Sequence, residues 1–396
     1  MDDAVVVLDG STIAYAGPAS DAPTTPDAEV VDAQTVLPGL WDCHTHLMGL
    51  TTMSLGALHE VPVAVRAARA TADLRRALAA GVTSIRDAGG LGVLLGRVVR
   101  EGSIPGPHCY GAGAILSTTG GHGDLHDLPL DWMHDLARLD GTLRVCDGVD
   151  GVITAVREQL RIGADVIKVC ASGGVLSERD HPIHQQFTDA ELAAIVEVAG
   201  LAERTVMAHC HGKPGMLAAV EAGVGTIEHG TYLDEEVCAA MVERNVTLVP
   251  TRLIVTDLIA AGQGPLTDAM WQKLVATDAR HRDAVALAHE AGVRIAMGTD
   301  VLVSVPGAPV SWGRHGRELV LLTEAGLTPL EAIEAATANG PGTLGPRAPH
   351  TGQLVAGFDA DVVTVAGDPS ERIEVLADPG SITGVWVGGR RVDHVG

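Results

Sequence analysis

Apolar runs that are typical of buried β-strands recur along most of the chain. Longer stretches with the apolar spacing of helices, such as VAVRAARATADLRRALAA, separate most of these runs, and several end in an Ala-Gly-Val sequence that stops the helix. Alternation of buried strands with helices is typical of the α/β class with a parallel sheet, and eight such units predict a (β/α)8 TIM barrel. The eight predicted strands cover residues 36–44, 82–87, 108–113, 164–170, 204–210, 224–229, 246–251 and 293–299.

The two ends of the chain follow a different pattern. Residues 1–36 and the stretch from about 348 onward consist of short strand-like runs joined by polar turns, such as AVVVLDG and DADVVTVAG. Because chain ends often lie close together in space, we expect these two segments to fold together. The predicted organisation is a small composite β-sandwich of residues 1–36 plus 348–396 and a barrel of residues 37–347.

The stretch from about residue 114 to residue 150 interrupts the barrel pattern. It is rich in Gly, His and Asp, and it is too long for an ordinary connection between a strand and a helix. Long loops in compact domains commonly carry function, so we expect an active-site loop here.

Composition and charge indicate which partners and which cellular location to expect. Twenty-seven basic against fifty acidic residues give a formal net charge of −23, which argues against nucleic acid or an anionic membrane as a partner. No run of about 18 apolar residues predicts a membrane span. Two acidic residues follow the first Met, where a secretory signal would carry positive charge, and six cysteines without CxxC spacing fit reduced thiols. We therefore expect a cytoplasmic protein.

Polar residues end several of the apolar runs, and in a parallel barrel the C-terminal ends of distant strands meet at one rim, where active sites lie. The first two of these residues are two positions apart, so a strand points both side chains to the same face. Four imidazoles, a carboxylate and a lysine at one rim predict a metal site. The six residues are His44, His46, Lys168, His209, His229 and Asp300.

The order and local sequences of these residues resemble the amidohydrolase superfamily of metal-dependent hydrolases, and the resemblance covers nearly the whole chain. It implies that His44 and His46 bind the more buried of two divalent metal ions, with zinc as the expected metal. His209 and His229 would bind the second ion. Lys168 would be carboxylated by CO2, and its carbamate would bridge the two metals.

Further roles complete the predicted site. By the same resemblance, Asp300 is a ligand of the first metal and a catalytic residue that takes a proton from the bridging water and passes it to the departing amine. His122, in the predicted active-site loop, would polarise the attacked carbonyl. His211 shares a strand face with His209, so the spacing allows either to be the ligand; the family pattern favours His209 and leaves His211 to contact substrate or orient a ligand. Tyr232, just beyond the sixth predicted strand, is a candidate to bind a substrate carboxylate.

Two more polar residues have several possible interpretations. Arg86 closes the second predicted strand and is compatible with an ion pair to Asp87, a contact inside the barrel, or substrate binding. His315 follows the loop after the eighth predicted strand and is a candidate for the pocket wall.

Local sequences such as IKVCASGG, AHCHG and TIEHGTYLD are most similar to the imidazolonepropionase-like branch, which holds Xaa-Pro and Xaa-Arg dipeptidases and ochratoxin-hydrolysing amidases. Deaminases place a glutamate shortly after the fifth-strand histidine, where this chain has Cys-His-Gly-Lys. The resemblance therefore predicts a binuclear amidohydrolase that cleaves a dipeptide or N-acyl amino acid with a metal-bridging hydroxide. Hydrolysis of a cyclic amide or imidazolone, a mycotoxin-type amidase and a decayed barrel that retains metal are the alternatives. The expected partner is a small-molecule substrate, and relatives favour a homo-oligomer.

Overall fold

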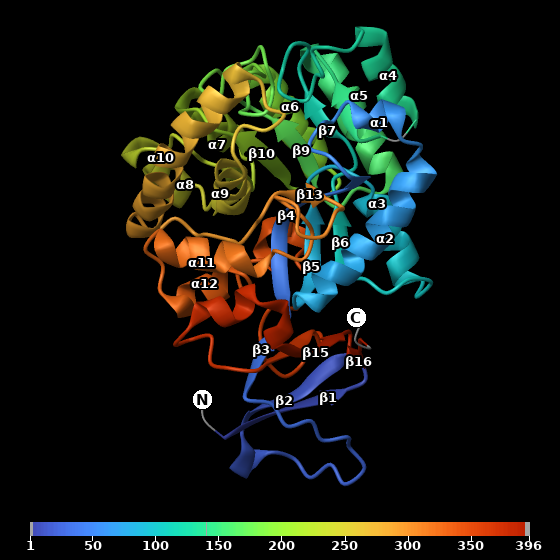
Figure 1. The fold of residues 1–396 in the computed structure, drawn as a ribbon, viewed down its shortest axis with the longest axis vertical. Helices are drawn as coiled ribbons and strands as arrows, with labels where there is room; N and C mark the ends of the chain where they lie inside the picture. The colour runs from blue at the N-terminus through green and yellow to red at the C-terminus, as the bar shows by residue number, and fades with distance from the viewer. Residues whose placement is uncertain (1–2, 140, 393–396) are drawn as a thin grey trace.

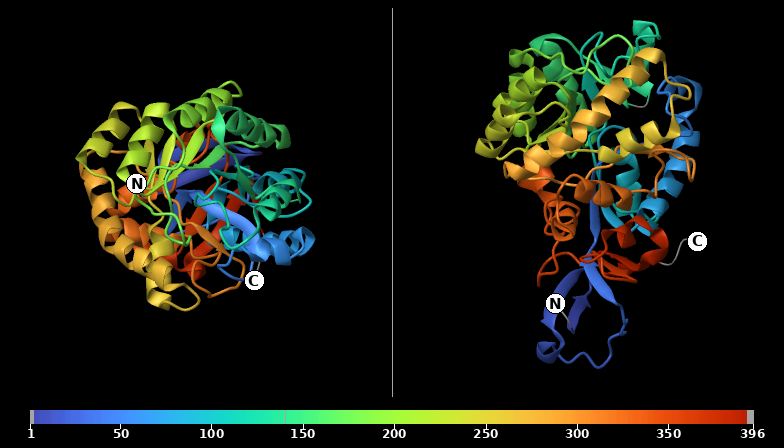
Figure 2. Two further views of the ribbon diagram at one scale, coloured as in Figure 1. Left: turned by 90° about the horizontal axis from the view of Figure 1, so that it is seen from above. Right: turned by 60° about the vertical axis from the view of Figure 1, so that its left-hand side comes forward.

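The computed structural model, which describes residues 3–139 and 141–392, has a helix-covered barrel of parallel strands above a smaller β region (Figure 1). Seen from above, the helices form a ring around the strands (Figure 2). Strands from the start of the chain and strands from its end lie together in the smaller region. This architecture confirms the predicted (β/α)8 barrel with a small β-sandwich domain.

The barrel strands run parallel in two hydrogen-bonded sheets, with the orders β13-β4-β5-β6 and β12-β11-β10-β9-β7-β8. The first sheet contains β4 (Leu40–Leu50), β5 (Val82–Asp87), β6 (His108–Gly111) and β13 (Val301–Val303). The second contains β7 (Ile115–Ser117), β8 (Leu143–Val145), β9 (Ile167–Cys170), β10 (Val206–Cys210), β11 (Thr226–His229) and β12 (Thr247–Val249).

Most of the helices follow a strand and pack on the outside of the barrel. Local signals set their ends: Thr188 and Glu191 form a capping box at the start of one helix, and Gly163 and Gly223 end two others at φ 94° and 95°. Within the described residues, none of the helices combines the length and the apolar character needed to cross a membrane. The helices are α1 (Ala57–Glu60), α2 (Val63–Ala79), α3 (Gly92–Arg100), α4 (Leu130–Leu139), α5 (Gly148–Ile162), α6 (Asp189–Gly200), α7 (Lys213–Ala222), α8 (Glu235–Glu243), α9 (Arg252–Ala261), α10 (Asp268–Glu290), α11 (Gly316–Glu324) and α12 (Pro329–Ala335).

The eighth predicted strand is irregular. Residues 293–299 are tied to β12 by a parallel bridge between Leu248 and Ile295, and the chain then reaches β4 through the hydrogen bond from Asp300 N to His44 O, at 2.7 Å. These contacts close the barrel between β12 and β4. The prediction of a regular strand over 293–299 is wrong because the chain turns at Asp300, with φ 62°, and regular pairing begins after it, in β13.

The stretch from 114 to 150 is also more regular than predicted. It contains β7, α4 and β8, and β7 pairs with both β8 and β9. Met133 and Leu136, three residues apart on α4, are buried in one apolar cluster with residues of β7 and β8. This spacing is visible in the sequence, so the prediction of a single long loop is wrong. Residues 118–129 form the longest loop that the structure describes in this stretch.

Both chain ends contribute to the smaller β region. β1 (Ala4–Asp9) and β2 (Thr12–Pro18) form an antiparallel hairpin, which joins the C-terminal segment through the bond from Ile13 N to Phe358 O, at 2.8 Å. A four-stranded antiparallel sheet has the order β16-β15-β14-β3, with β3 (Thr35–Pro38), β14 (Val362–Val365), β15 (Ile382–Val387) and β16 (Arg390–Arg391). The run predicted as one strand over 36–44 is therefore divided between β3 of this sheet and β4 of the barrel. The exact domain boundaries stay a prediction.

Candidate active site

The residues predicted as ligands from β4, β9, β11 and the turn before β13 converge at one rim of the barrel. His46 Nε2 lies 3.2 Å from Asp300 Oδ1, and Lys168 Nζ lies 3.3 Å from His44 Nε2. Ligand atoms of His44, His229 and Asp300 all lie within 4.8 Å of one another. All five side chains are buried. This group has the composition and the spacing to hold a metal ion.

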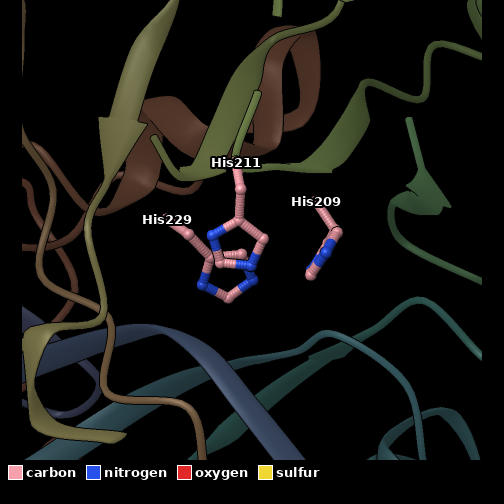
Figure 3. Close-up of side chains that lie close together, drawn as sticks. All are labelled: His209, His211 and His229. Atoms are coloured by element: carbon pink, nitrogen blue, oxygen red, sulfur yellow. The ribbon is translucent and has the colours of Figure 1, made fainter. Parts of the chain in front are cut away.

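A second group of imidazoles lies directly beside the first. Ligand atoms of His209, His211 and His229 lie within 4.8 Å of one another, and Figure 3 shows the three rings close together. The rings of His211 and His229 stack with their centroids 4.8 Å apart. His229 belongs to both groups, so the two candidate metal positions are adjacent.

One nitrogen of each of these five imidazoles lies within hydrogen-bonding distance of a protein partner. The Nδ1 atom is the one engaged in four of them, which leaves Nε2 available for a metal ion. His209 differs, because its Nε2 lies 3.3 Å from Gly173 O. The Nδ1 partners are Glu228 Oε2 for His44 at 2.6 Å, Gly89 O for His46 at 2.9 Å, Thr231 Oγ1 for His211 at 2.8 Å and Thr251 Oγ1 for His229 at 2.7 Å.

Glu228 connects the first group of ligands to a buried arginine. It accepts a hydrogen bond from His44 Nδ1 at 2.6 Å and two from Arg86 Nη2 at 2.8 and 3.0 Å. Burial alone would raise the pKa of Glu228, but the guanidinium of Arg86 and the hydrogen bond from His44 lower it to about 2. Glu228 is therefore ionised, and of the interpretations of Arg86 the contact inside the barrel is the one observed.

Three residues of the rim have an unusual backbone conformation. His229, Thr251 and Asp300 have φ values of 70°, 54° and 62°, in the left-handed region that residues other than glycine seldom adopt. The turn at His229 breaks the alternation of β11, so that Glu228 and His229 both contact His44 inside the barrel.

Burial sets the charge of the candidate ligands. It lowers the pKa of His209, His211 and His229 well below the usual value, so these imidazoles are in the neutral form that binds metal. Burial likewise lowers the pKa of the Lys168 amine. For Asp300, burial acts against ionisation, but His44 and the hydrogen bond to His46 lower the pKa of the carboxyl below its usual value.

His122 of the 118–129 loop lies beside the imidazole groups. Its ring stacks on His209 with the centroids 4.3 Å apart, and its Nδ1 is hydrogen-bonded with Ser177 Oγ at 2.9 Å. Burial lowers the pKa of His122 to about 4, so the imidazole is neutral. A Cβ at Gly174 would collide with His122 Nδ1, so a side chain there would displace the ring.

A cavity of about 420 Å³ opens over the site, and all six predicted ligands, His122 and His211 contribute to its wall. Among the described residues, Arg86, Tyr232 and His315 are not part of that wall. The Tyr232 N–H donates to His211 O at 2.9 Å, whereas His315 is fully buried and its Nδ1 donates to Asp42 Oδ2 at 2.7 Å. The expectation that His315 lines the pocket is therefore wrong, whereas Tyr232 lies outside the cavity wall and its contact with substrate stays a prediction.

Comparison with known proteins assigns the chain to a family. The model of the Amidohydrolase family matches residues 35–392. The chain belongs to the amidohydrolase family. It is 40% identical over 406 residues to ochratoxinase of Aspergillus niger, an alignment that covers 98% of this chain and 82% of that protein. The crystal structure of that ochratoxinase matches with a TM-score of 0.90 and 39% identity, covering 99% of this chain and 91% of the other.

Two further relatives fall in the branch expected from the local sequences. The structure of a prolidase in complex with N-methylphosphonate-L-proline matches with a TM-score of 0.90 at 34% identity, over 98% of this chain and 94% of that one. Imidazolonepropionase of Nocardia farcinica is 25% identical over 97% of this chain and 90% of its own length. These relationships confirm the predicted branch and make this amidohydrolase a hydrolase of amide bonds.

Sequence reasoning missed residues that hold the site of this amidohydrolase in place. Lys273 on α10 donates from Nζ to three backbone carbonyl oxygens of the 174–180 loop, those of Gly174 at 2.9 Å, Ser177, and Asp180 at 3.2 Å. The loop carries the Ser177 hydroxyl that engages His122, so Lys273 fixes one wall of the site from a helix more than 90 residues away in the chain. A lysine within a helix gives no signal of such a contact in the sequence.

Proposed function

We propose that this amidohydrolase binds two divalent metal ions and cleaves the amide bond of an N-acyl amino acid or dipeptide. The observation that carries the proposal is the position of His229 in two adjacent groups of candidate ligands, one with His44 and Asp300 and one with His209 and His211. Neutral imidazoles and a carboxylate suit zinc. The names of the related ochratoxinase and prolidase support amide-bond hydrolysis on small molecules.

Lys168 fits the role of a carbamate. Its amine is buried, 3.3 Å from His44 Nε2, and burial lowers its pKa toward the neutral form that reacts with CO2. An ammonium ion at this point would repel a metal cation. Reaction of the neutral amine with CO2 forms a nitrogen–carbon bond, releases one proton and creates a carboxylate with two oxygen donors. The modified side chain would add these oxygen donors beside the imidazole of His44.

The remaining steps follow from residues of this chain. The two groups of imidazoles with Asp300 would hold the metal ions, which would supply Lewis-acid activation of water and of the scissile carbonyl. The ionised Asp300 carboxylate accepts the proton of the attacking water and delivers it to the amine nitrogen as the carbon–nitrogen bond breaks. With Nδ1 of the neutral His122 accepting the hydrogen bond of the Ser177 hydroxyl, the ring proton lies on Nε2, which donates to the carbonyl oxygen as negative charge develops there.

Lys168→Ala tests the proposal. With the zinc-loaded enzyme and a panel of N-acyl amino acids and dipeptides, we expect amine release that falls by more than about 100-fold in the variant, beyond the range of outer-sphere effects. Metal content by mass spectrometry should fall below two ions per chain. In the native protein, 13C-bicarbonate should add a carbonyl resonance that the variant lacks.

Lys213→Ala is the matched control, because Lys213 is a partly exposed lysine on α7 that pairs with Asp234. It should retain full activity and metal content. Release of amine at an unchanged rate by Lys168→Ala would contradict the role of Lys168. If the enzyme hydrolysed cyclic amides but none of the N-acyl amino acids and dipeptides, that result would favour the imidazolonepropionase-like alternative.

A further inference from the structure

Two apolar walls flank the candidate metal site. One comes from α9 and α10 and includes Ile254, Leu258 and Met270; the other comes from the 118–129 loop and includes Leu125 and Leu128. In Figure 1, α9 and α10 lie on one side of the barrel mouth, and β7 and α4 lie on the opposite side. The 118–129 loop connects β7 to α4. A substrate whose scissile carbonyl lies over the site therefore meets apolar side chains on both sides of the amide.

Basic side chains are nearly absent from this cavity. Lys168, among the candidate ligands, is the one Lys or Arg in the part of the wall that the structure describes. Three cations among the described residues have other partners: Lys273 bonds backbone carbonyls, Arg252 pairs with Asp278 at 3.1 Å, and the exposed Arg179 lies 3.9 Å from Asp127 of the cavity wall. Within the described wall, the cavity therefore presents no guanidinium fork for a carboxylate.

The titratable side chains farther from the metal site are carboxylates, or imidazoles with one ring nitrogen hydrogen-bonded. Asp124, Asp127 and Glu178 line the cavity. Arg179, 3.9 Å from Asp127, offsets the charge of that residue, and Asp124 and Glu178 place negative charge along the approach to the site. His126 and His281 also line it, but each has its Nε2 bonded to a backbone carbonyl oxygen, at 3.1 and 2.8 Å. Like charges across a contact oppose binding, so these acidic residues disfavour a substrate carboxylate.

We infer that this amidohydrolase recognises apolar groups on both sides of the scissile amide and not a free carboxylate, so that uncharged amides are substrates as good as N-acyl amino acids. The inference rests on the proposed amide hydrolysis and extends it to a further class of substrate. The reaction balances in the same way: water adds to the carbonyl carbon, the carbon–nitrogen bond breaks, and a carboxylic acid and an amine leave.

A matched pair of substrates tests the inference: N-benzoyl-L-phenylalanine and N-benzoylphenethylamine, which differ by the carboxylate alone. We expect kcat/KM values within about tenfold of each other, or a preference for the uncharged amide, because a charge-assisted contact to a carboxylate would be worth about 10- to 150-fold. A preference of more than about tenfold for the carboxylated compound would overturn the inference while leaving amide hydrolysis intact.

Hydrolysis of neither compound would count against the proposed function, and binding then tests the inference. Calorimetry on the metal-loaded protein should give similar Kd values for the two compounds, and clearly tighter binding of the carboxylated one would overturn it. Leu128→Ser and Met270→Ser, one from each wall, should each raise KM or Kd for both compounds by about tenfold. Leu330→Ser, at an exposed position on α12, is the control. Unchanged values in both wall variants would also overturn the inference.

Discussion

Glu228 is buried between the guanidinium of Arg86 and the imidazole of His44, and it accepts hydrogen bonds from both. Its carboxylate holds the proton of His44 on Nδ1, so that Nε2 faces Asp300 and Lys168. It also compensates the charge of Arg86, which is fully buried. One side chain thus orients a candidate ligand and stabilises the barrel interior.

The variant Glu228→Gln separates these two effects. Metal affinity should weaken by about 10- to 100-fold, because the amide orients His44 less firmly than a carboxylate does. The free energy of unfolding should fall by about 3–5 kcal/mol, because Arg86 is left as an uncompensated buried charge. Chelator competition and chemical denaturation measure the two quantities. Glu197→Gln, exposed on α6, should change neither, and unaltered metal affinity in Glu228→Gln would contradict the orienting role.

Which site residues the sequence reveals depends on local geometry. His44 and His46 could be predicted because strand alternation places residues two apart on the same face. The same rule puts Glu228 and His229 on opposite faces of β11, so it hides the contact of Glu228 with His44. The positive φ of His229 overrides the alternation, and no spacing in the sequence predicts that turn.

At the scale of elements, the 174–180 loop is held by α10. Lys273 donates to three carbonyl oxygens of the loop, and Ser177 of the same loop engages His122. Contacts between elements so far apart in sequence arise from tertiary packing, which the spacing of apolar residues does not encode. Apolar spacing likewise predicts a regular strand over residues 293–299, because it does not encode the turn at Asp300 that shifts the pairing to β13.

Lys273→Met should therefore impair catalysis while leaving the metal site loaded. We expect kcat to fall by about tenfold to 100-fold, because loss of the three hydrogen bonds frees the loop and misplaces His122. Metal content and KM should change little, which distinguishes misplacement of His122 from general destabilisation. Steady-state kinetics and metal analysis of Lys273→Met test this prediction. Lys213→Met, on the surface of α7, is the control. An unchanged kcat would show that the loop keeps its position without the lysine.

For the whole molecule, the barrel and the small β region are joined by an ion pair between a half-buried histidine and a buried aspartate. His108 on β6 donates from Nε2 to Asp361 Oδ1 at 3.2 Å, and Asp361 immediately precedes β14 of the four-stranded sheet. The eightfold repeat and the pairing of the chain ends could be predicted from the sequence, because both follow from local patterns. This pair could not, because its partners lie 253 residues apart.

His108 makes stability depend on pH. Burial alone would lower the pKa of His108, but the hydrogen bond and the charge of Asp361 raise it above the usual value of about 6.5. The stabilisation is therefore fully present below about pH 6.5 and is lost as the pH rises through the higher pKa of the folded state. Thermal unfolding followed across this range should show a decline in Tm that His108→Asn flattens. His134→Asn on α4 should retain the decline, and an equal decline in both variants would contradict this role.

The left-handed backbone at His229, Thr251 and Asp300 has a consequence for evolution in the laboratory. Each such position costs about 1–3 kcal/mol, which glycine would largely relieve. Selection for heat resistance alone would therefore reward replacement of His229 and Asp300, the residues nearest the proposed chemistry. Variants of this amidohydrolase selected for thermostability alone would therefore lose catalytic activity. Each round of selection would have to include an activity assay to retain it.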